Sequence, residues 1–270
     1  MTAAELQPAR AQVLDDIIAA QRRRRRWFRG QFILVWVVLV GIIGVFLWNA
    51  GRGISWAFVL QSGPLILQGA GITILVSLVS IVVAIFLAIF GALGRLSTNA
   101  ILNSLASLYV SLVRGTPLLV QIYFIYFGLP FAGIRLDAIP AGIAALGFNY
   151  GAYMTEIFRA GIQAVPPSQR EAAQALGMPE RLAFRRIVLP QAVRIVIPAI
   201  GNDFVAMIKD SALISTIAVQ ELLWRAQRIG RSEHQVLASL AIAAVVYWVL
   251  TIIFSFFQEK LEQRMARGDR

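Results

Sequence analysis

Few residues in this chain are of a type that could carry out catalysis or bind a metal. The 270-residue sequence has no cysteine and one histidine, His234, which follows Glu233 in a polar segment. Disulfides, thiol catalysis and cysteine-ligated metals are therefore excluded, and one histidine offers little for a metal site. The GxxxxGK[ST] phosphate loop and the HExxH and GxSxG patterns are also absent from the sequence. We predict no catalytic, metal-binding or cofactor-binding residue, and we interpret His234 as a solvated surface residue.

Polar residues within apolar runs are the remaining candidates for a functional site. Glu156 lies in "YMTEIFRAG", and Asn202, Asp203 and Lys209 lie in "IPAIGNDFVAMIKD". Ionisable side chains at membrane depth are costly, so they usually face a partner or a cavity. The proline and glycine of the second stretch loosen its helix, and irregular backbone is tolerated where it lines a cavity. These four residues form a candidate substrate path.

Each of these residues also has a purely structural interpretation. Glu156 is spaced to pair with Arg159 within one helix, and Lys209 beside Asp210 is consistent with the edge of a membrane. Arg114, in "RGTP", is better explained as a side chain that snorkels to an interface or caps a helix.

The composition predicts that membrane-spanning helices position these residues. Hydrophobic residues make up 58% of the chain and charged residues only 14%, with a mean hydropathy of +0.71. Soluble domains carry about 25% charged residues, and the apolar runs here approach the ~20 residues that span a bilayer as a helix. We predict an all-α integral membrane protein, a polytopic helical bundle. Six spans are favoured over five, at residues 32–49, 65–93, 117–131, 138–162, 191–209 and 236–257.

The distribution of basic residues predicts the orientation of these spans. The net charge is +11, but the charges fall at the ends of apolar runs rather than on a surface typical of nucleic-acid binding. The five arginines at 22–26 are interpreted as an anchor on the cytoplasmic side, where basic residues are favoured. We therefore expect residues 1–31 to form a cytoplasmic basic segment, 32–49 an additional first span, and 259–270 a cytoplasmic tail.

One charged, helix-forming insert separates two of the apolar runs. After the Pro166–Pro167 break, Ser168 and Glu171 have the spacing of a capping box, and Gly177 is placed to end the helix. A second helix is expected from Pro179 to Pro190. Two short helices that meet at Gly177 favour a docking element for a soluble partner, with an idle amphipathic loop as the alternative.

The insert resembles the signature loop of permease subunits in binding-protein-dependent ATP-binding-cassette importers. The shared pattern is E-A-A, three residues, G, nine residues, I-x-L-P, which here comprises Glu171, Ala172, Ala173, Gly177, Ile187, Leu189 and Pro190. Stretches at 67–77, 109–130, 150–177 and 208–223 look like the polar amino-acid subgroup of these permeases. The resemblance covers about residues 65–258 and implies a type I importer permease fold, with residues 166–190 as the coupling region held in a cleft of the ATPase.

The same resemblance implies the partners and the location of the chain. Two ATPase subunits would bind ATP and Mg²⁺, a second permease subunit would complete a homo- or heterodimer, and an external solute-binding protein would deliver the amino acid. The implied location is the inner membrane of a bacterial cell, with both termini in the cytoplasm. Separately from the resemblance, the placement of these residues suggests that Glu156 and Asp203 accept the ammonium group of an amino acid, and that helix ends near Gly115–Thr116 and Gly201 donate N–H groups to its carboxylate.

Three alternatives stay open or are set aside at this point. The cargo of such a permease could instead be an opine or another amino-acid derivative. A stand-alone channel or ion-driven carrier is a rival of another class, although it leaves the 170–190 helices without a purpose. A membrane-embedded enzyme is disfavoured because the sequence lacks a catalytic cluster.

Overall fold

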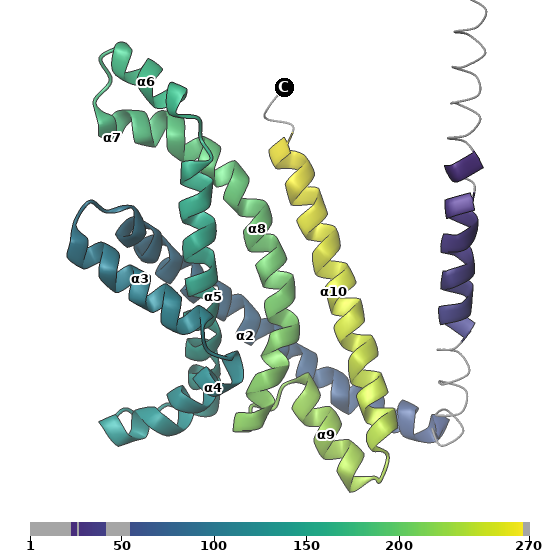
Figure 1. Ribbon diagram of the computed structural model, residues 1–270. Helices are drawn as coiled ribbons and strands as arrows, with labels where there is room; N and C mark the ends of the chain where they lie inside the picture. The colour runs from purple at the N-terminus through teal and green to yellow at the C-terminus, as the bar shows by residue number, and fades with distance from the viewer. Residues whose placement is uncertain (1–22, 26, 42–54, 267–270) are drawn as a thin grey trace, which may run out of the picture. The chain divides into compact units, whose positions relative to one another are not determined.

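The computed structural model describes residues 23–25, 27–41 and 55–266, and every regular element in these ranges is helical. The chain divides into two units, residues 1–54 and 55–270. In the first unit, residues 27–41 form one helix; the remainder of the predicted span at 32–49, and most of the predicted basic segment, lie outside the described residues. The all-α membrane fold is confirmed. The elements of the second unit (Figure 1) are α2 (Trp56–Leu96), α3 (Ala100–Arg114), α4 (Leu118–Tyr123), η1 (Phe124–Gly128), η2 (Leu129–Ala132), α5 (Ala138–Gln163), α6 (Pro167–Ala175), α7 (Glu180–Ala183), η3 (Phe184–Val188), α8 (Leu189–Asp210), η4 (Ser211–Ile217), α9 (Leu222–Ser232) and α10 (Val236–Ala266).

The observed helices refine the predicted spans. In the described part of the chain, three helical segments are long and apolar enough to cross a bilayer: Trp56–Leu96, Glu180–Ile217 and Val236–Met265. A fourth results if Ala100–Arg114 and Leu118–Ala132, which are bent by 107°, are counted as one broken span. α5 coincides with the predicted 138–162 span but is not among these segments. The count of six spans therefore stays a prediction.

α2 begins earlier than predicted. The predicted span covers residues 65–93, whereas the helix starts at Trp56 and keeps Pro64 inside. Proline cannot donate a backbone hydrogen bond, so α2 continues through Pro64, its ninth residue, with one intrahelical bond fewer. At 41 residues and 1.5 Å per residue, α2 is roughly 60 Å long, about twice the hydrocarbon thickness.

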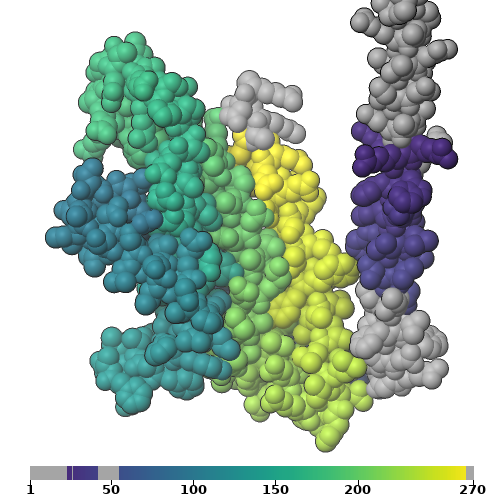
Figure 2. Space-filling model, in the orientation of Figure 1, coloured from purple at the N-terminus to yellow at the C-terminus, as the bar shows by residue number. Residues whose placement is uncertain are grey.

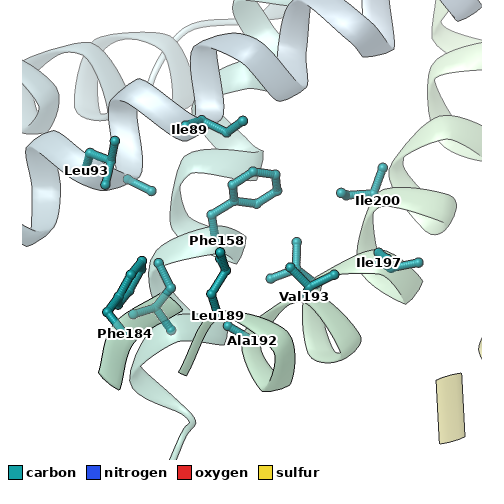
Figure 3. A pocket seen from close by; sticks show the side chains of 12 residues that line it. Ile89, Leu93, Phe158, Phe184, Leu189, Ala192, Val193, Ile197 and Ile200 are labelled. Carbon is teal, nitrogen blue, oxygen red and sulfur yellow. The ribbon is translucent and has the colours of Figure 1, made fainter. Parts of the chain in front are cut away.

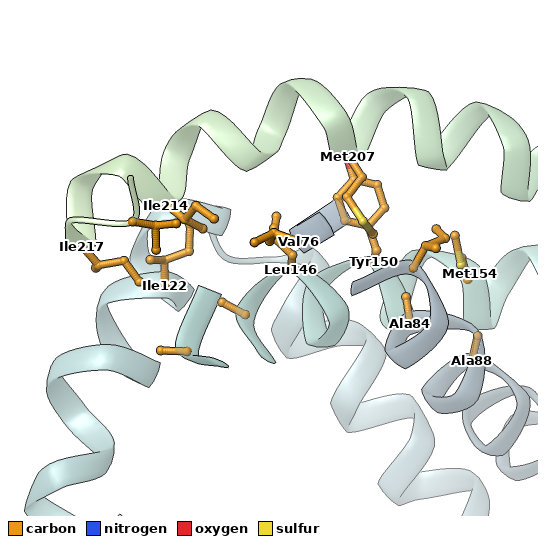
Figure 4. Packing of buried hydrophobic residues seen from close by; sticks show 14 residues of the cluster. Val76, Ala84, Ala88, Ile122, Leu146, Tyr150, Met154, Met207, Ile214 and Ile217 are labelled. Atoms are coloured by element: carbon orange, nitrogen blue, oxygen red, sulfur yellow. The ribbon is translucent and has the colours of Figure 1, made fainter. Parts of the chain in front are cut away.

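The core of the second unit is an apolar cluster between α2, α4, α5, α8 and η4 (Figure 4). Figure 4 shows Val76, Ala84 and Ala88 of α2 facing Leu146, Tyr150 and Met154 of α5, with Met207 of α8 and Ile214 and Ile217 of η4 alongside. The small residues let α2 and α5 approach closely, which is how helices associate in lipid, where both surroundings are apolar. This packing fixes α5, and with it Glu156, against α2.

Candidate functional site

The insert at 166–190 folds as two helices that meet at Gly177, as predicted. Gly177 has φ of +75°, a left-handed conformation that suits glycine. Its N–H donates to the carbonyl of Gln174 (2.9 Å), and the N–H of Met178 donates to that of Ala173 (3.0 Å). These two bonds form a Schellman motif, which satisfies carbonyl groups at the end of α6. We call residues 166–183 the knob; Figure 2 shows its helices α6 and α7 at one end of the second unit.

The predicted capping box at Ser168 and Glu171 is wrong. α6 begins at Pro167, the N-cap residue is Pro166, and no side chain caps the helix. Proline has a φ near −65° and lacks the N–H that would be unpaired in the first turn, so Pro167 starts the helix without help from Ser168. Glu171 is therefore not used in a cap, and its side chain is exposed.

The second helix does not end at Pro190, in contrast to the prediction. α7, the π turn η3 and α8 run on, and the segment Glu180–Ile217 is long enough to span the membrane. Pro190 lies in the first turn of α8, directly after the wider π turn, where its ring meets less of the preceding backbone. The side chain of Gln191 donates to the carbonyl of Ile187 (2.9 Å). α7, the second helix of the knob, and the membrane segment are thus one continuous helical element.

The resemblance motif divides into exposed and packed residues. Glu171, Ala172, Gly177, Leu189 and Pro190 are exposed, Ala173 is 1% exposed, and Ile187 is half-buried. Leu176, which sequence reasoning missed, lies beside Gly177 with 81% of its surface exposed. Single exposed leucines are common on protein surfaces, so the interest of Leu176 comes from its position at the bend between α6 and α7.

A small apolar cluster holds the base of the knob. Val165, Val188 and Ala192 are buried together, with Ile162 of α5 and Phe184 of η3 packed against them. These residues come from the segment that enters the knob and from the one that leaves it, so the cluster packs the end of α5 against η3 and the start of α8.

Glu156 lies in an ion-pair network. Its Oε1 accepts from Nε of Arg95 (3.0 Å), and its Oε2 accepts from Nε and Nη2 of Arg159 (3.0 and 2.6 Å). Arg95 also donates to Ser107 of α3, and its carbonyl accepts from Asn103 (2.8 Å). The intrahelical pair with Arg159 is therefore present, and Arg95, which the sequence analysis did not single out, ties α2 and α3 to α5. With both carboxylate oxygens engaged, Glu156 offers less to a substrate than we expected.

The other three path residues lie in different environments on α8. Asn202 is exposed and accepts from Nε2 of Gln258 (2.7 Å), and Lys209 is exposed. Asp203 is half-buried, and its Oδ2 is buried without a hydrogen-bond partner among the described residues. A buried carboxylate oxygen without a partner is costly, which makes Asp203 the strongest of the four as an acceptor for a cationic group.

Tyr150 of α5, which the sequence analysis did not single out, contacts Asp210, the residue after Lys209. The hydroxyl of Tyr150 donates to Oδ2 of Asp210 (2.8 Å), so α5 is bonded to the end of α8. Among the described residues, no group of three or more His, Asp or Glu could hold a metal ion. The chemical capacity of this region is that of one buried carboxylate oxygen without a partner, Oδ2 of Asp203.

Glu221 forms a buried polar cluster at the opposite end of the second unit from the knob (Figure 1). It is fully buried and caps α9, since its carboxylate accepts from the N–H groups of Leu223 (2.9 Å) and Trp224 (2.7 Å). The hydroxyl of Tyr247 in α10 donates to it, and Thr73 of α2 lies at 3.5 Å. Burial raises the pKa of Glu221, although these hydrogen bonds oppose the shift.

Comparison with known proteins gives consistent similarities. Residues 80–267 match the family model described as binding-protein-dependent transport system inner membrane component. The L-cystine transport system permease protein TcyB of Bacillus subtilis strain 168 is 40% identical over 80% of this chain and 94% of its own length. The arginine transport system permease protein ArtQ of the same organism is 37% identical over 76% and 94%. A solved amino acid ABC transporter with histidines matches with a TM-score of 0.75 and 36% identity, covering 78% of this chain and 99% of that one.

Proposed function

The chain belongs to the family of binding-protein-dependent transport system inner membrane components, and on that premise we propose that it is the permease subunit of an ATP-driven importer for polar amino acids. The observation that carries the proposal is the knob: two short helices with an exposed motif, continuous with a membrane-length helix. The relatives named for cystine and arginine, and the solved amino acid transporter, support the class of cargo. An amino-acid derivative would use the same arrangement.

In this proposal the knob is where an ATPase subunit binds. Glu171 and Ala172 supply an exposed polar and small surface, and the 81%-exposed side chain of Leu176 supplies an apolar anchor. Apolar anchors surrounded by polar residues carry most of the energy in protein interfaces. A dimer of permease subunits would present two knobs, one to each of two ATPases, which would also hold the ATP and Mg²⁺.

The continuity of the knob with α8 suggests how ATP is coupled to transport. When the ATPases close, they would draw the two knobs together, and each Glu180–Ile217 segment would tilt as a rigid lever. The path would then change from inward-open to outward-open, and hydrolysis would reset it. ATP shifts this two-state equilibrium only by its differential affinity for the two states. Asp203 would accept the substrate ammonium group on the way, while an external binding protein sets most of the selectivity.

The proposed orientation places the knob in the cytoplasm. The C-terminal end of α10 lies at the same end of the second unit as α6 and α7, and α9 lies at the other end (Figure 1). A cytoplasmic knob therefore implies a cytoplasmic C-terminus, which agrees with the predicted orientation of the spans. The chain would be a multi-pass protein of the bacterial inner membrane.

The test is capture of the ATPase subunit by the tagged permease from detergent-solubilised membranes. We expect Glu171→Lys and Leu176→Asp each to reduce capture several-fold, because both change the exposed surface of the knob without touching a buried residue. Glu233→Lys is the matched control, an exposed charge reversal beside α9 at the far end of the unit. Unchanged capture by the two knob variants would contradict the proposal and favour a stand-alone channel or carrier.

A further inference from the structure

An apolar cavity of about 380 Å³ lies between the C-terminal halves of α2 and α5, the π turn η3 and the first half of α8. All twelve lining side chains are apolar. Figure 3 shows Phe158 of α5 between Ile89 of α2 and Leu189 and Val193 of α8. None of these residues belongs to the candidate substrate path, and a polar amino acid would find no hydrogen-bonding partner here.

The cavity opens to the surface of the second unit. Its floor is formed by Ala92 and Ala192, each 2% exposed, and by Val196. Two of the side chains at its entrance, Leu93 and Val193, are 54% and 41% exposed. An apolar opening in the membrane part of a protein faces the bilayer unless another chain covers it.

The polarity and the volume of the cavity limit what can occupy it. Water is excluded, because a bound water needs two to four polar partners and the lining has none. A transmembrane helix is too large: the helix at 27–41 is roughly 22 Å long and about 10 Å wide, which is several times the cavity volume. An acyl chain fits, because the cavity has the volume of roughly a dozen water-sized groups. The chain also keeps apolar surroundings when it moves from the bilayer into the cavity.

Basic residues next to the lining indicate the kind of lipid. Arg185 and Arg186 follow Phe184 of the lining directly and are both exposed. Arg159, which follows Phe158, is already paired with Glu156. Exposed arginines beside an apolar cavity at the end of a membrane segment are suited to a phosphate group.

We propose that one acyl chain of an anionic membrane phospholipid occupies this cavity, with its phosphate group at Arg185 and Arg186. Phe184 and Leu189 line the cavity and belong to the helical element that continues from the knob, so the bound lipid packs against that element. This inference rests on the membrane location of the chain. Arg185 and Arg186 lie outside the knob (166–183) but inside the coupling region 166–190 that the resemblance implies, so their replacement is judged by lipid preference and not by ATPase capture.

The test uses the transporter reconstituted in bilayers of phosphatidylethanolamine and phosphatidylglycerol, with a trace of phosphatidylglycerol that carries a diazirine in its acyl chain. After irradiation, mass spectrometry locates the adducts. We expect them to concentrate on the cavity lining in the unmodified protein. Val193→Trp, which fills the cavity, should lower these adducts several-fold, whereas Ile195→Trp, at an exposed apolar position of α8 outside the lining, should not. Replacing both Arg185 and Arg186 with Gln should abolish the preference for this probe over its phosphatidylcholine counterpart.

Three results would overturn the inference. On the unmodified protein, the adducts could be spread over all lipid-facing residues in proportion to their exposure, with no excess on the cavity lining. Adducts could persist unchanged in Val193→Trp. A second permease copy could cover the site instead, which a photoreactive thiol reagent attached to Val193→Cys would reveal as permease–permease adducts in place of lipid adducts; labelling is confined to this site because the chain has no cysteine. ATPase capture through the knob would be unaffected in each case, so failure here is distinguishable from failure of the proposed function.

Discussion

Gly177 shows how a single residue sets the shape of the knob. It ends α6 in the left-handed region with φ of +75°, and a Cβ added there would meet no atom within 4 Å. Glycine is therefore favoured here by the backbone conformation, and not by a lack of room for a side chain. An L-residue costs about 1–2 kcal/mol in this conformation, β-branched residues are worse, and asparagine tolerates it best.

A matched pair of substitutions tests this constraint. We expect Gly177→Val to lower ATPase capture several-fold, because the turn between α6 and α7 is strained, and Gly177→Asn to retain most of it. The measurement is the amount of ATPase recovered per tagged permease. Equal loss in both variants would point to side-chain size at the interface rather than to backbone strain.

Glu156 and Asp203 differ in their surroundings, and this difference predicts different defects. Glu156→Gln leaves Arg95 and Arg159 without a charged partner and should lower the free energy of unfolding by about 2 kcal/mol, between exposed and fully buried pairs. Asp203→Asn should leave stability nearly unchanged and lower substrate uptake, since Oδ2 has no partner to lose. Thermal unfolding in detergent and uptake into proteoliposomes measure the two effects. The assignment fails if Asp203→Asn transports normally.

At the scale of secondary-structure elements, Glu221 joins three helices that are distant in sequence. Its carboxylate caps α9, accepts from Tyr247 of α10 and lies beside Thr73 of α2. Gly69 allows the close approach, since a Cβ there would lie 2.7 Å from the Cα of Leu222. The orientation of α9 therefore depends on this one buried side chain.

The raised pKa of Glu221 predicts a pH dependence of stability. Because burial disfavours the charged form, the folded protein favours the protonated carboxyl group. Its contribution is complete below the ordinary glutamate pKa of about 4.3 and is lost as the pH rises through the raised folded-state value. As the pH rises through these values, we expect the thermal unfolding temperature to fall less steeply in Glu221→Gln than in the unmodified protein. An unchanged slope in the variant would contradict the burial argument.

At the scale of the whole second unit, the close packing of α2 on α5 holds the bundle together. Gly147 and Gly151 are spaced as a GxxxG motif on α5, and a Cβ at Gly147 would lie 2.6 Å from Cγ1 of Val83 in α2. Small residues of this spacing bring helices together in lipid, where apolar burial gives no advantage. The close contact of α5 with α2 therefore depends on glycine, which has no side chain, at these positions of α5.

Two alanine substitutions separate crowding from helix propensity. Gly147→Ala should destabilise the protein by about 1–3 kcal/mol through overpacking. Gly71→Ala, in α2 with no atom within 4 Å of the added Cβ, should stabilise it by about 0.5–1 kcal/mol. Thermal unfolding of both variants in the same detergent gives the comparison. Stabilisation by both would mean that α2 and α5 are further apart than the structure has them.

Features that depend on neighbouring residues alone were predictable from the sequence. Runs of apolar residues predicted an all-helical membrane fold, and the boundaries of α5 and α8 were close to those expected. The turn at Gly177 was also predicted, because the preference of glycine for positive φ is a local property. The start of α6 was missed by two residues, since two local rules competed and the proline prevailed over the capping box.

The composition and local pattern of the chain by themselves determined its membrane class, its charged insert and the turn within that insert, because hydropathy and backbone preferences act over a few residues. Only the tertiary structure decided which groups those residues meet. Arg95 reaches Glu156 from 61 positions away, and Glu221 contacts Thr73 across 148. The continuation of the knob into α8 and the apolar cavity beside it arise in the same way, because both depend on how α2, α5 and α8 pack, and packing joins residues that no local rule relates.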